Sequence, residues 1–355
     1  NVKNKGNIYV VQDEEGSVQN HNEFQKFTLF RGSKKNLNEI DRFYTWGKFD
    51  DEIWKKKYKD YKEKFLLTGS PRTDIWKKKI AKKIYVSDIN YISKKYQNFT
   101  LIISSGLSSK KELKKKLYID KVTRAPLKES KNEILKRNIW QLKINKDLIQ
   151  ISQQLAIKNP KKKFIFRPHP DEDIIDYKSI IKKKISNLFI ESSFDVTPWL
   201  IASDQIIQSC STVAIQAEFL DKSIITFDPN YLKNIHRNFP NKLGVNIKKK
   251  NDIFKLFEKN NYQYDNKKLI ENRFLNQKNY CSDLILNDIK KIQNKKKFKI
   301  NIIKFRLLGF IFNLKDKFLK KYSYKHNNQS FYKARRTLRN KNPGISKKEI
   351  VNFYN

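Results

Sequence analysis

The sequence predicts an α/β fold with two domains, each built around a parallel sheet. At 355 residues the chain is long enough to bury two separate cores. Short apolar runs rich in β-branched residues, typical of buried strands, alternate with longer amphipathic stretches that are typical of helices. Polar clusters of Gly, Pro, Ser and His follow several of the apolar runs directly, as loops of a parallel sheet do.

The first domain is predicted over residues 1–92 and carries only part of its sheet. Its candidate strands are 7–12, 43–46 and 65–68. A helix is predicted over 50–62, with Ile53, Trp54, Tyr58 and Tyr61 on one face. The sequence begins at Asn1 and contains no Met, so we expect it to be a piece of a longer protein that has lost the first strands of this domain.

The second domain, over residues 93–294, repeats the alternation of strand and helix and is predicted to be a nearly complete Rossmann-like unit. Its candidate strands are 99–103, 163–166, 188–191, 205–208 and 223–227. Its candidate helices are 132–158, 197–202 and 213–220, and the charged stretch 108–124 is predicted to be a helix or an insertion.

Residues 295–355 have a different composition. They are basic, interleaved with aromatic and aliphatic residues, and contain only Asp316 and Glu349 as acidic residues. An amphipathic helix is predicted over 300–322, followed by a weakly ordered tail. One hypothesis is a peripheral contact with the anionic inner face of the cytoplasmic membrane. The alternative is a helix that packs back on the first domain.

The charge and cysteine content limit the function classes. There are 77 Lys and Arg against 36 Asp and Glu, a formal charge of +41, but the triple-Lys runs are spread along the whole chain. A nucleic-acid-binding protein would gather such residues on one face, so nucleic acid is not expected as a partner. The two cysteines show neither pairing nor metal-ligand spacing, which favours the cytoplasm. No metal-binding pair of carboxylates is visible either, so neither a metal nor a resident cofactor is expected.

Four polar clusters follow candidate strands, where ligands of parallel sheets bind. They are Asp13-Glu14-Glu15-Gly16, Ser104-Ser105-Gly106, Arg167-Pro168-His169-Pro170 and Ser209-Cys210-Ser211-Thr212. Three supply cations, hydroxyls and helix N-termini, which suit a phosphate, and the first supplies carboxylates that can accept a proton. This combination predicts transfer from a nucleotide donor. The alternatives are an ordinary acidic loop at the first cluster and a simple helix cap at Ser211 and Thr212.

Six stretches, in this order, resemble the bacterial surface carbohydrate biosynthesis proteins, which are glycosyltransferases of the GT-B type. They are DEEG at 13–16, WG at 46–47, TGSPRTD at 68–74, RPHP at 167–170, PW at 198–199 and SCSTVAIQA at 209–217. The resemblance covers about residues 7–230 and implies two Rossmann-like domains facing a cleft. The acidic, His-Pro and hydroxyl motifs are also similar to those of transferases that use CMP-activated sialic acid or Kdo.

The resemblance implies roles for individual residues. Glu14 or Asp13, with Glu15 beside them, would act on the acceptor hydroxyl. His169 and Pro170 would bind the nucleotide, with Arg167, Ser211 and Thr212 at its phosphate. Gln216 stands where such families place a Glu that holds the ribose, and its amide can still form a hydrogen bond.

The predicted partners are therefore a nucleotide-sugar donor, CMP-linked by this resemblance, and a glycan or lipid-linked acceptor. Two alternatives stay within the same class: a transferase of UDP- or GDP-sugars, and a CDP-glycerol-type glycerophosphotransferase. A third alternative is a non-catalytic polysaccharide assembly protein that keeps the fold without the chemistry.

Overall fold

The first sheet of the protein has three parallel strands. The computed structural model describes residues 8–14, 16, 18, 31–106, 113, 117, 130–170, 172–181, 185–231, 239–259, 264–275 and 279–295. Strands β1 (Val10–Gln12), β2 (Arg42–Thr45) and β3 (Phe65–Leu67) pair in that order. All three were predicted, with boundaries that differ by up to three residues. The predicted helix over 300–322 lies outside the described residues, and so does almost all of 108–124.

Helices α2 (Lys34–Glu39) and α3 (Lys48–Lys57) accompany this sheet. The predicted helix over 50–62 divides in two, because Tyr58 leaves the helical conformation (φ −117°, ψ 65°) and a 3-10 helix follows over Lys59–Lys64. This turn stacks the Tyr58 ring on Trp54, with centroids 5.9 Å apart, and lets its hydroxyl donate to the Gly32 carbonyl at 2.6 Å. The break in the helix thus completes the aromatic core of the first sheet.

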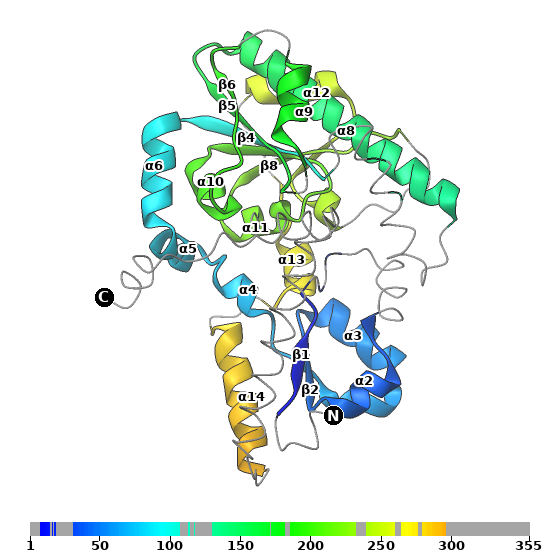
Figure 1. The fold of residues 1–355 in the computed structure, drawn as a ribbon. Helices are drawn as coiled ribbons and strands as arrows, with labels where there is room; N and C mark the ends of the chain where they lie inside the picture. The colour runs from blue at the N-terminus through cyan, green and yellow to red at the C-terminus, as the bar shows by residue number, and fades with distance from the viewer. Residues whose placement is uncertain are drawn as a thin grey trace, which may run out of the picture. The chain divides into compact units, whose positions relative to one another are not determined.

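A second sheet of six parallel strands forms the larger part of the described chain (Figure 1). Its strands are β4 (Phe99–Ile103), β5 (Lys163–Arg167), β6 (Leu188–Ile190), β7 (Gln205–Gln208), β8 (Ser223–Phe227) and β9 (Val245–Ile247). The spatial order is β6-β5-β4-β7-β8-β9, which is the Rossmann order with β4 as its first strand. The α/β class with parallel sheets is confirmed, and β9 is a strand that the sequence did not predict.

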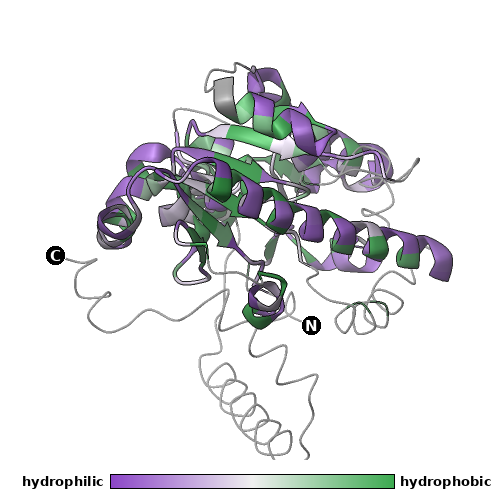
Figure 2. Ribbon diagram, turned by 90° about the horizontal axis from the view of Figure 1, so that it is seen from above, coloured by the Kyte–Doolittle hydropathy of each residue, from purple (hydrophilic) through white to green (hydrophobic). Residues whose placement is uncertain are grey.

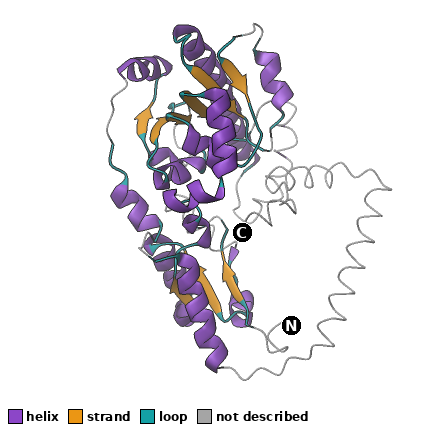
Figure 3. Ribbon diagram, turned by 90° about the vertical axis from the view of Figure 1, so that its left-hand side faces the viewer, coloured by secondary structure: helices purple, strands orange, loops and turns teal. Residues whose placement is uncertain are grey.

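The second sheet is buried on both faces (Figure 3). Alternate residues of each central strand enter opposite cores: Ile206 of β7 belongs to one cluster and Ile207 to the other. One face is covered by α8 (Lys131–Lys158), α9 (Ile174–Ile180) and α12 (Lys250–Lys259). The other is covered by α6 (Val86–Tyr96), α10 (Val196–Ala202) and α11 (Val213–Phe219).

Hydropathy follows this layering. The strands of the second sheet are mostly apolar, while the surrounding helices present both apolar and polar residues (Figure 2). Such double burial explains why these strands read as continuous apolar runs rather than as an alternating pattern.

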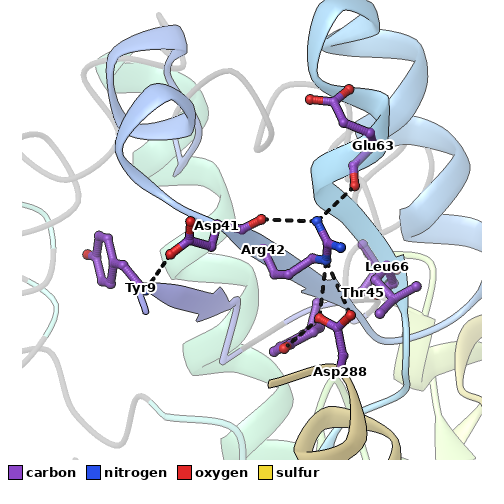
Figure 4. Close-up of polar contacts among 8 residues, drawn as sticks. Tyr9, Asp41, Arg42, Thr45, Glu63, Leu66 and Asp288 are labelled. Atoms are coloured by element: carbon purple, nitrogen blue, oxygen red, sulfur yellow. Dashed lines mark hydrogen bonds and ion pairs between the residues drawn. The ribbon is translucent and has the colours of Figure 1, made fainter. Parts of the chain in front are cut away.

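The helix α14 (Cys281–Lys295) contacts the first sheet, although it follows the second sheet in the sequence. Its Asp288 accepts hydrogen bonds from Arg42 Nε at 3.1 Å and from the Tyr44 hydroxyl at 3.1 Å (Figure 4). Burial, with the Asp288 charge, raises the pKa of Tyr44, which therefore stays a neutral donor. Within the described ranges, no helix combines the length and apolar character that crossing a membrane requires.

Candidate functional site

The order of the second sheet locates the candidate site. Strands β4 and β7 are neighbours, and the chain runs outward from them in opposite directions along the sheet. In open parallel sheets, ligands bind outside the carboxyl ends of the strands at such a switch point. The loop after β4 is Ser104-Ser105-Gly106 and the loop after β7 is Ser209 to Thr212. Two of the predicted clusters therefore flank the position that the fold favours for a nucleotide.

The loops after β4 and β5 are joined by one buried carboxylate, that of Glu172. Its Oε1 accepts from the Gly106 amide at 2.7 Å, and its Oε2 accepts from the His169 amide at 2.8 Å. The Ser104 hydroxyl also donates to it, and the Asn145 side chain of α8 donates at 2.9 Å. Burial raises the pKa of Glu172 to about 7, against the hydrogen bonds from Ser104, His169 and Gly106 that lower it.

His169 lies against the glycine turn after β4. Gly106 has φ +99°, a conformation that side chains rarely adopt, and a Cβ placed there would lie 3.7 Å from His169 Nδ1. The His169 side chain is half-buried and Pro170 is exposed. The amide and hydroxyl of Ser105 both donate to Asn145 Oδ1, at 3.1 and 3.3 Å. Ser104, Ser105, Gly106 and His169 thus form one connected group, as expected if they act together.

Arg167 is placed differently from the other predicted phosphate ligands. Its two Nη atoms donate to the carbonyls of Ser193 and Phe194, each at 2.7 Å, and its guanidinium lies 5.8 Å from the Trp199 ring. Burial lowers its pKa to about 10, partly offset by the charges of Asp195 and Glu191. The side chain thus anchors the loop after β6. Its role at a phosphate stays a prediction, and the engagement of both Nη atoms by carbonyls counts against it.

The loop after β7 makes a sharp turn at Cys210, which has φ +55°. The Cys210 amide donates to Asn241 at 2.7 Å, and the Ser211 amide donates to the Gln208 side chain at 3.0 Å. Ser211 is buried and its Oγ accepts from the Val213 amide at 3.4 Å, as a helix cap does, whereas Thr212 is exposed and its side chain forms no cap. The Thr212 hydroxyl is therefore the more accessible of the two predicted phosphate donors.

Gln216 was predicted to hold a ribose. It is buried, and its amide nitrogen donates to the Thr197 hydroxyl of α10. Glu218, two residues on, has a different partner, because its carboxylate accepts from the Asn266 side chain. Ribose binding by Gln216 stays a prediction, and the structure shows its amide engaged between two helices.

The acidic loop after β1 belongs to the first sheet. The Asp13 carboxylate is buried and forms an ion pair with Arg31, while its carbonyl accepts from the Trp46 indole. Glu14 is exposed, and its backbone carbonyl accepts from Arg72 at 3.5 Å. Glu15 lies outside the described residues. Of the two described carboxylates of this loop, that of Glu14 is therefore the more exposed, and its catalytic role stays a prediction.

Two of the matching stretches serve the fold. In TGSPRTD, Ser70 caps the short helix α4 (Pro71–Asp74), and Asp74 accepts from the amides of Cys281 and Ser282, both at 2.9 Å. In WG, a Cβ on Gly47 would overlap the carbonyl of Arg273. These residues hold the C-terminal helices against the first sheet and need no role in chemistry.

Sequence reasoning missed Glu172 and its partners on α8. The available signals were a carboxylate three residues after His169 and the polar residues Gln141 and Asn145, one helical turn apart on an amphipathic helix. Gln141 donates to the Ser105 carbonyl, and Asn145 is buried. Buried polar groups in a helix are costly unless they are paired, so this pair marks a polar contact at that place.

The comparisons with known proteins concern three-dimensional structure. No protein-family model matches the chain, and no curated protein sequence matches it. The wall teichoic acid polymerase TagF is similar at 16% identity and a TM-score of 0.47, over 74% of this chain and 61% of that chain. A putative UDP-N-acetylglucosamine 2-epimerase from Listeria monocytogenes is similar at 10% identity and a TM-score of 0.47, over 81% and 69%.

A third similar structure is that of S. aureus MnaA with UDP, at 13% identity and a TM-score of 0.46, over 80% of this chain and 68% of that chain. This chain covers 61% of the TagF polymerase, which is less than two thirds of its length. Likenesses at these values leave the function to be argued from the site.

Proposed function

We propose that this protein is a glycosyltransferase that takes a sugar from a nucleotide donor and transfers it to a surface polysaccharide or a lipid-linked acceptor. The observation that carries the proposal is the switch point between β4 and β7, flanked by a glycine turn with His169 beside it and by the Ser209–Thr212 loop. Backbone amides, hydroxyls and an imidazole at this position suit a nucleotide phosphate. The resemblance of the motifs to those of transferases using CMP-sialic acid or Kdo supports a CMP-linked donor.

In the proposed reaction, an acceptor hydroxyl attacks the anomeric carbon of the donor sugar. A new bond forms between the acceptor oxygen and that carbon, and the bond from the carbon to the phosphate oxygen breaks. The hydroxyl proton passes to the exposed Glu14, and the electron pair leaves with the nucleotide. His169 and the Thr212 hydroxyl stabilise the charge on the departing phosphate. This proposal places nucleotide binding at the second sheet and proton acceptance at the first.

Nucleotide binding tests the donor class directly. Thermal unfolding is followed with CMP, CDP, UDP and GDP added one at a time. A ligand present at about 100 times its dissociation constant stabilises the folded state by about 2.7 kcal/mol, a readily measured shift. We expect the largest shift with CMP. A response to UDP, GDP or CDP without one to CMP would reassign the donor, and no response to any of the four would overturn the proposal.

The hydroxyl of Thr212 provides a site-specific test. Thr212→Ala removes one donor to the phosphate, and we expect about tenfold weaker CMP binding, the range of a hydrogen bond to a charged group. Ser87→Ala, which removes an exposed hydroxyl from α6, is the matched control and should bind CMP as the unaltered protein does. Equal affinities of the two variants would place the phosphate elsewhere.

We also propose peripheral contact with the anionic inner membrane through the basic residues 295–355, where lipid-linked acceptors would be reached. Co-sedimentation with vesicles that contain anionic lipid measures this. We expect the full chain to sediment and a chain ending at residue 294 to remain in solution. Sedimentation of both would assign membrane contact to another part of the protein.

A further inference from the structure

Glu172 has a contact pattern that the proposed reaction does not use. Its carboxylate receives four hydrogen bonds from three separate segments of the chain: Ser104 and Gly106 after β4, His169 after β5, and Asn145 on α8. Two of these donors are backbone amides. The contacts therefore determine where two loops lie as well as where two side chains point.

The surroundings of Glu172 make its charged form unfavourable, because the carboxylate is buried. The donors described above are neutral, and among the described residues the titratable groups that face it are Tyr177 from α9 and His169 on its own loop. Burial raises its pKa to about 7, so the charged form is held by dipoles rather than by a cation. A group placed at such cost and saturated with donors is suited to organising the loops around it.

We propose that Glu172 is a positioning residue that holds the 104–106 loop and His169 together as a single phosphate-binding cradle, without touching the ligand itself. The inference rests on the proposed nucleotide site and deepens it. The 28-residue helix α8 provides the rigid support, because Asn145 contacts both Glu172 and Ser105. The cradle is thus built across two strand ends and one helix.

The charge state of Glu172 gives the cradle a predictable pH dependence. An ionised carboxylate only accepts, and so it can bind the Gly106 and His169 amides at once. In the protonated carboxyl, one oxygen carries a hydrogen and becomes a donor. That oxygen then accepts poorly from the backbone amide that faces it. Phosphate affinity should therefore fall as the pH drops below about 7. Protonation of the His169 imidazole would act in the opposite direction, because a cation strengthens phosphate binding.

The change Glu172→Gln tests the proposal. It replaces one accepting oxygen by an NH2 group, which cannot accept a hydrogen bond from the Gly106 or His169 amide. Glu218→Gln is the matched control: burial also raises the pKa of Glu218 to about 7, yet its contact is with Asn266, away from the loops. The affinity for CMP is measured by calorimetry at pH 6, 7 and 8 on the full chain. We expect Glu172→Gln to bind about tenfold more weakly at pH 8, equivalent to about 1.4 kcal/mol, and Glu218→Gln to bind normally.

The pH profile separates positioning from a general structural role. Protonation of CMP itself affects every variant equally, so the difference between the unaltered protein and Glu172→Gln should shrink from pH 8 to pH 6. A difference that is constant over this range, or absent, would overturn the proposal. Should Glu172→Gln fail to fold, Asn145→Ala keeps the carboxylate, removes one donor, and is expected to weaken CMP binding in the same direction.

Hydrogen exchange keeps the inference distinguishable from the proposed function. Glu172→Gln should accelerate amide exchange at Gly106 and His169, and Glu218→Gln should not. If the unaltered protein binds none of the four nucleotides, the proposed function fails, while the exchange measurement still decides whether Glu172 holds the loops. Unchanged exchange at both amides would overturn the inference even in a protein that binds CMP.

Discussion

The two sheets differ in where the residues that complete them come from. The second sheet has helices on both faces, and its two cores consist largely of residues between 92 and 257. The first sheet has three strands, and it is completed by Asp288 on α14, a helix that follows the second sheet. The proposed binding loops therefore stand on a sheet whose cores come mostly from its own stretch of sequence, with Trp46, Trp76 and Phe274 added to one of them. The acidic loop belongs to a sheet whose strand β2 is held by Asp288 on a later helix.

The largest expected effect concerns the chemistry assigned to the first sheet. Glu14→Gln removes the proposed proton acceptor and should lower the transfer rate by about 10²- to 10⁴-fold, the usual contribution of general base catalysis. CMP affinity should not change, because the proposed binding residues lie on the second sheet. Single-turnover rates and calorimetry on the same sample measure the two quantities.

The control for this change is Glu52→Gln, which alters an exposed carboxylate on α3 of the same sheet. It should transfer sugar at the normal rate. Normal transfer by Glu14→Gln as well would refute the division of labour between the sheets.

A core substitution measures how far the second sheet is self-contained. Phe166 of β5 is fully buried and its ring lies 4.7 Å from that of Tyr177. Phe166→Ala should lower the free energy of unfolding by about 3–5 kcal/mol, through lost burial and the cavity that remains. Urea denaturation followed by circular dichroism measures this. A loss below about 1 kcal/mol would show that the core collapses around the gap and is less tightly packed than described.

The remote contact is tested at Asp74, whose carboxylate caps α14 through the amides of Cys281 and Ser282. Asp74→Ala should cost about 1–2 kcal/mol, as for other caps. Exchange of the β2 amides should accelerate while that of the β4 amides stays slow. Asp60→Ala, which removes an exposed partner of Lys34, is the control and should change stability by less than about 0.5 kcal/mol. Equal acceleration in both sheets would contradict the proposed independence of the second sheet.

A pH dependence of stability is also expected, from two carboxylates of the second domain. Burial raises the pKa of Glu172 and of Glu218 from 4.5 to about 7. Between these values the folded state binds more protons than the unfolded state, so a rising pH lowers the free energy of unfolding. The double variant Glu172→Gln, Glu218→Gln should lose less stability between pH 5 and pH 8 than the unaltered protein. The free energy of unfolding is measured by urea denaturation at several pH values. An equal loss between pH 5 and pH 8 in the double variant and the unaltered protein would contradict the raised pKa of the two carboxylates.

Much of the fold could be predicted because buried parallel strands leave a local signature. Strand β7 was predicted at its observed bounds, and so was β4, since each has adjacent β-branched or aliphatic residues and is followed directly by a polar, serine-containing loop. Strand β9 was missed because Val245–Ile247 offers two apolar residues around Asn246, too short for a pattern. The sequence thus identified strands from their own length and composition, and it carried no information about which strands pair with one another.

The site was predicted only in part, for a related reason. Glycine, His-Pro and hydroxyl clusters at strand ends are visible in the sequence, and the structure joins two of them. What joins them is a set of long-range hydrogen bonds, such as that from Gly106 to Glu172, 66 residues away, which no local pattern encodes. The engagement of Arg167 with the Ser193 carbonyl was hidden for the same reason.

The late position of α14 has a consequence for how the protein is made. Asp74 meets its partner amides, and Arg42 meets Asp288, only after more than 200 further residues have left the ribosome. A nascent chain can assemble β4 to β9 while β1 to β3 still wait for the helix that completes them. Strands β1 to β3 therefore precede β4 to β9 in the sequence but receive these contacts after them, and a chain truncated before residue 281 would lack the contacts of Asp74 and Arg42 with α14.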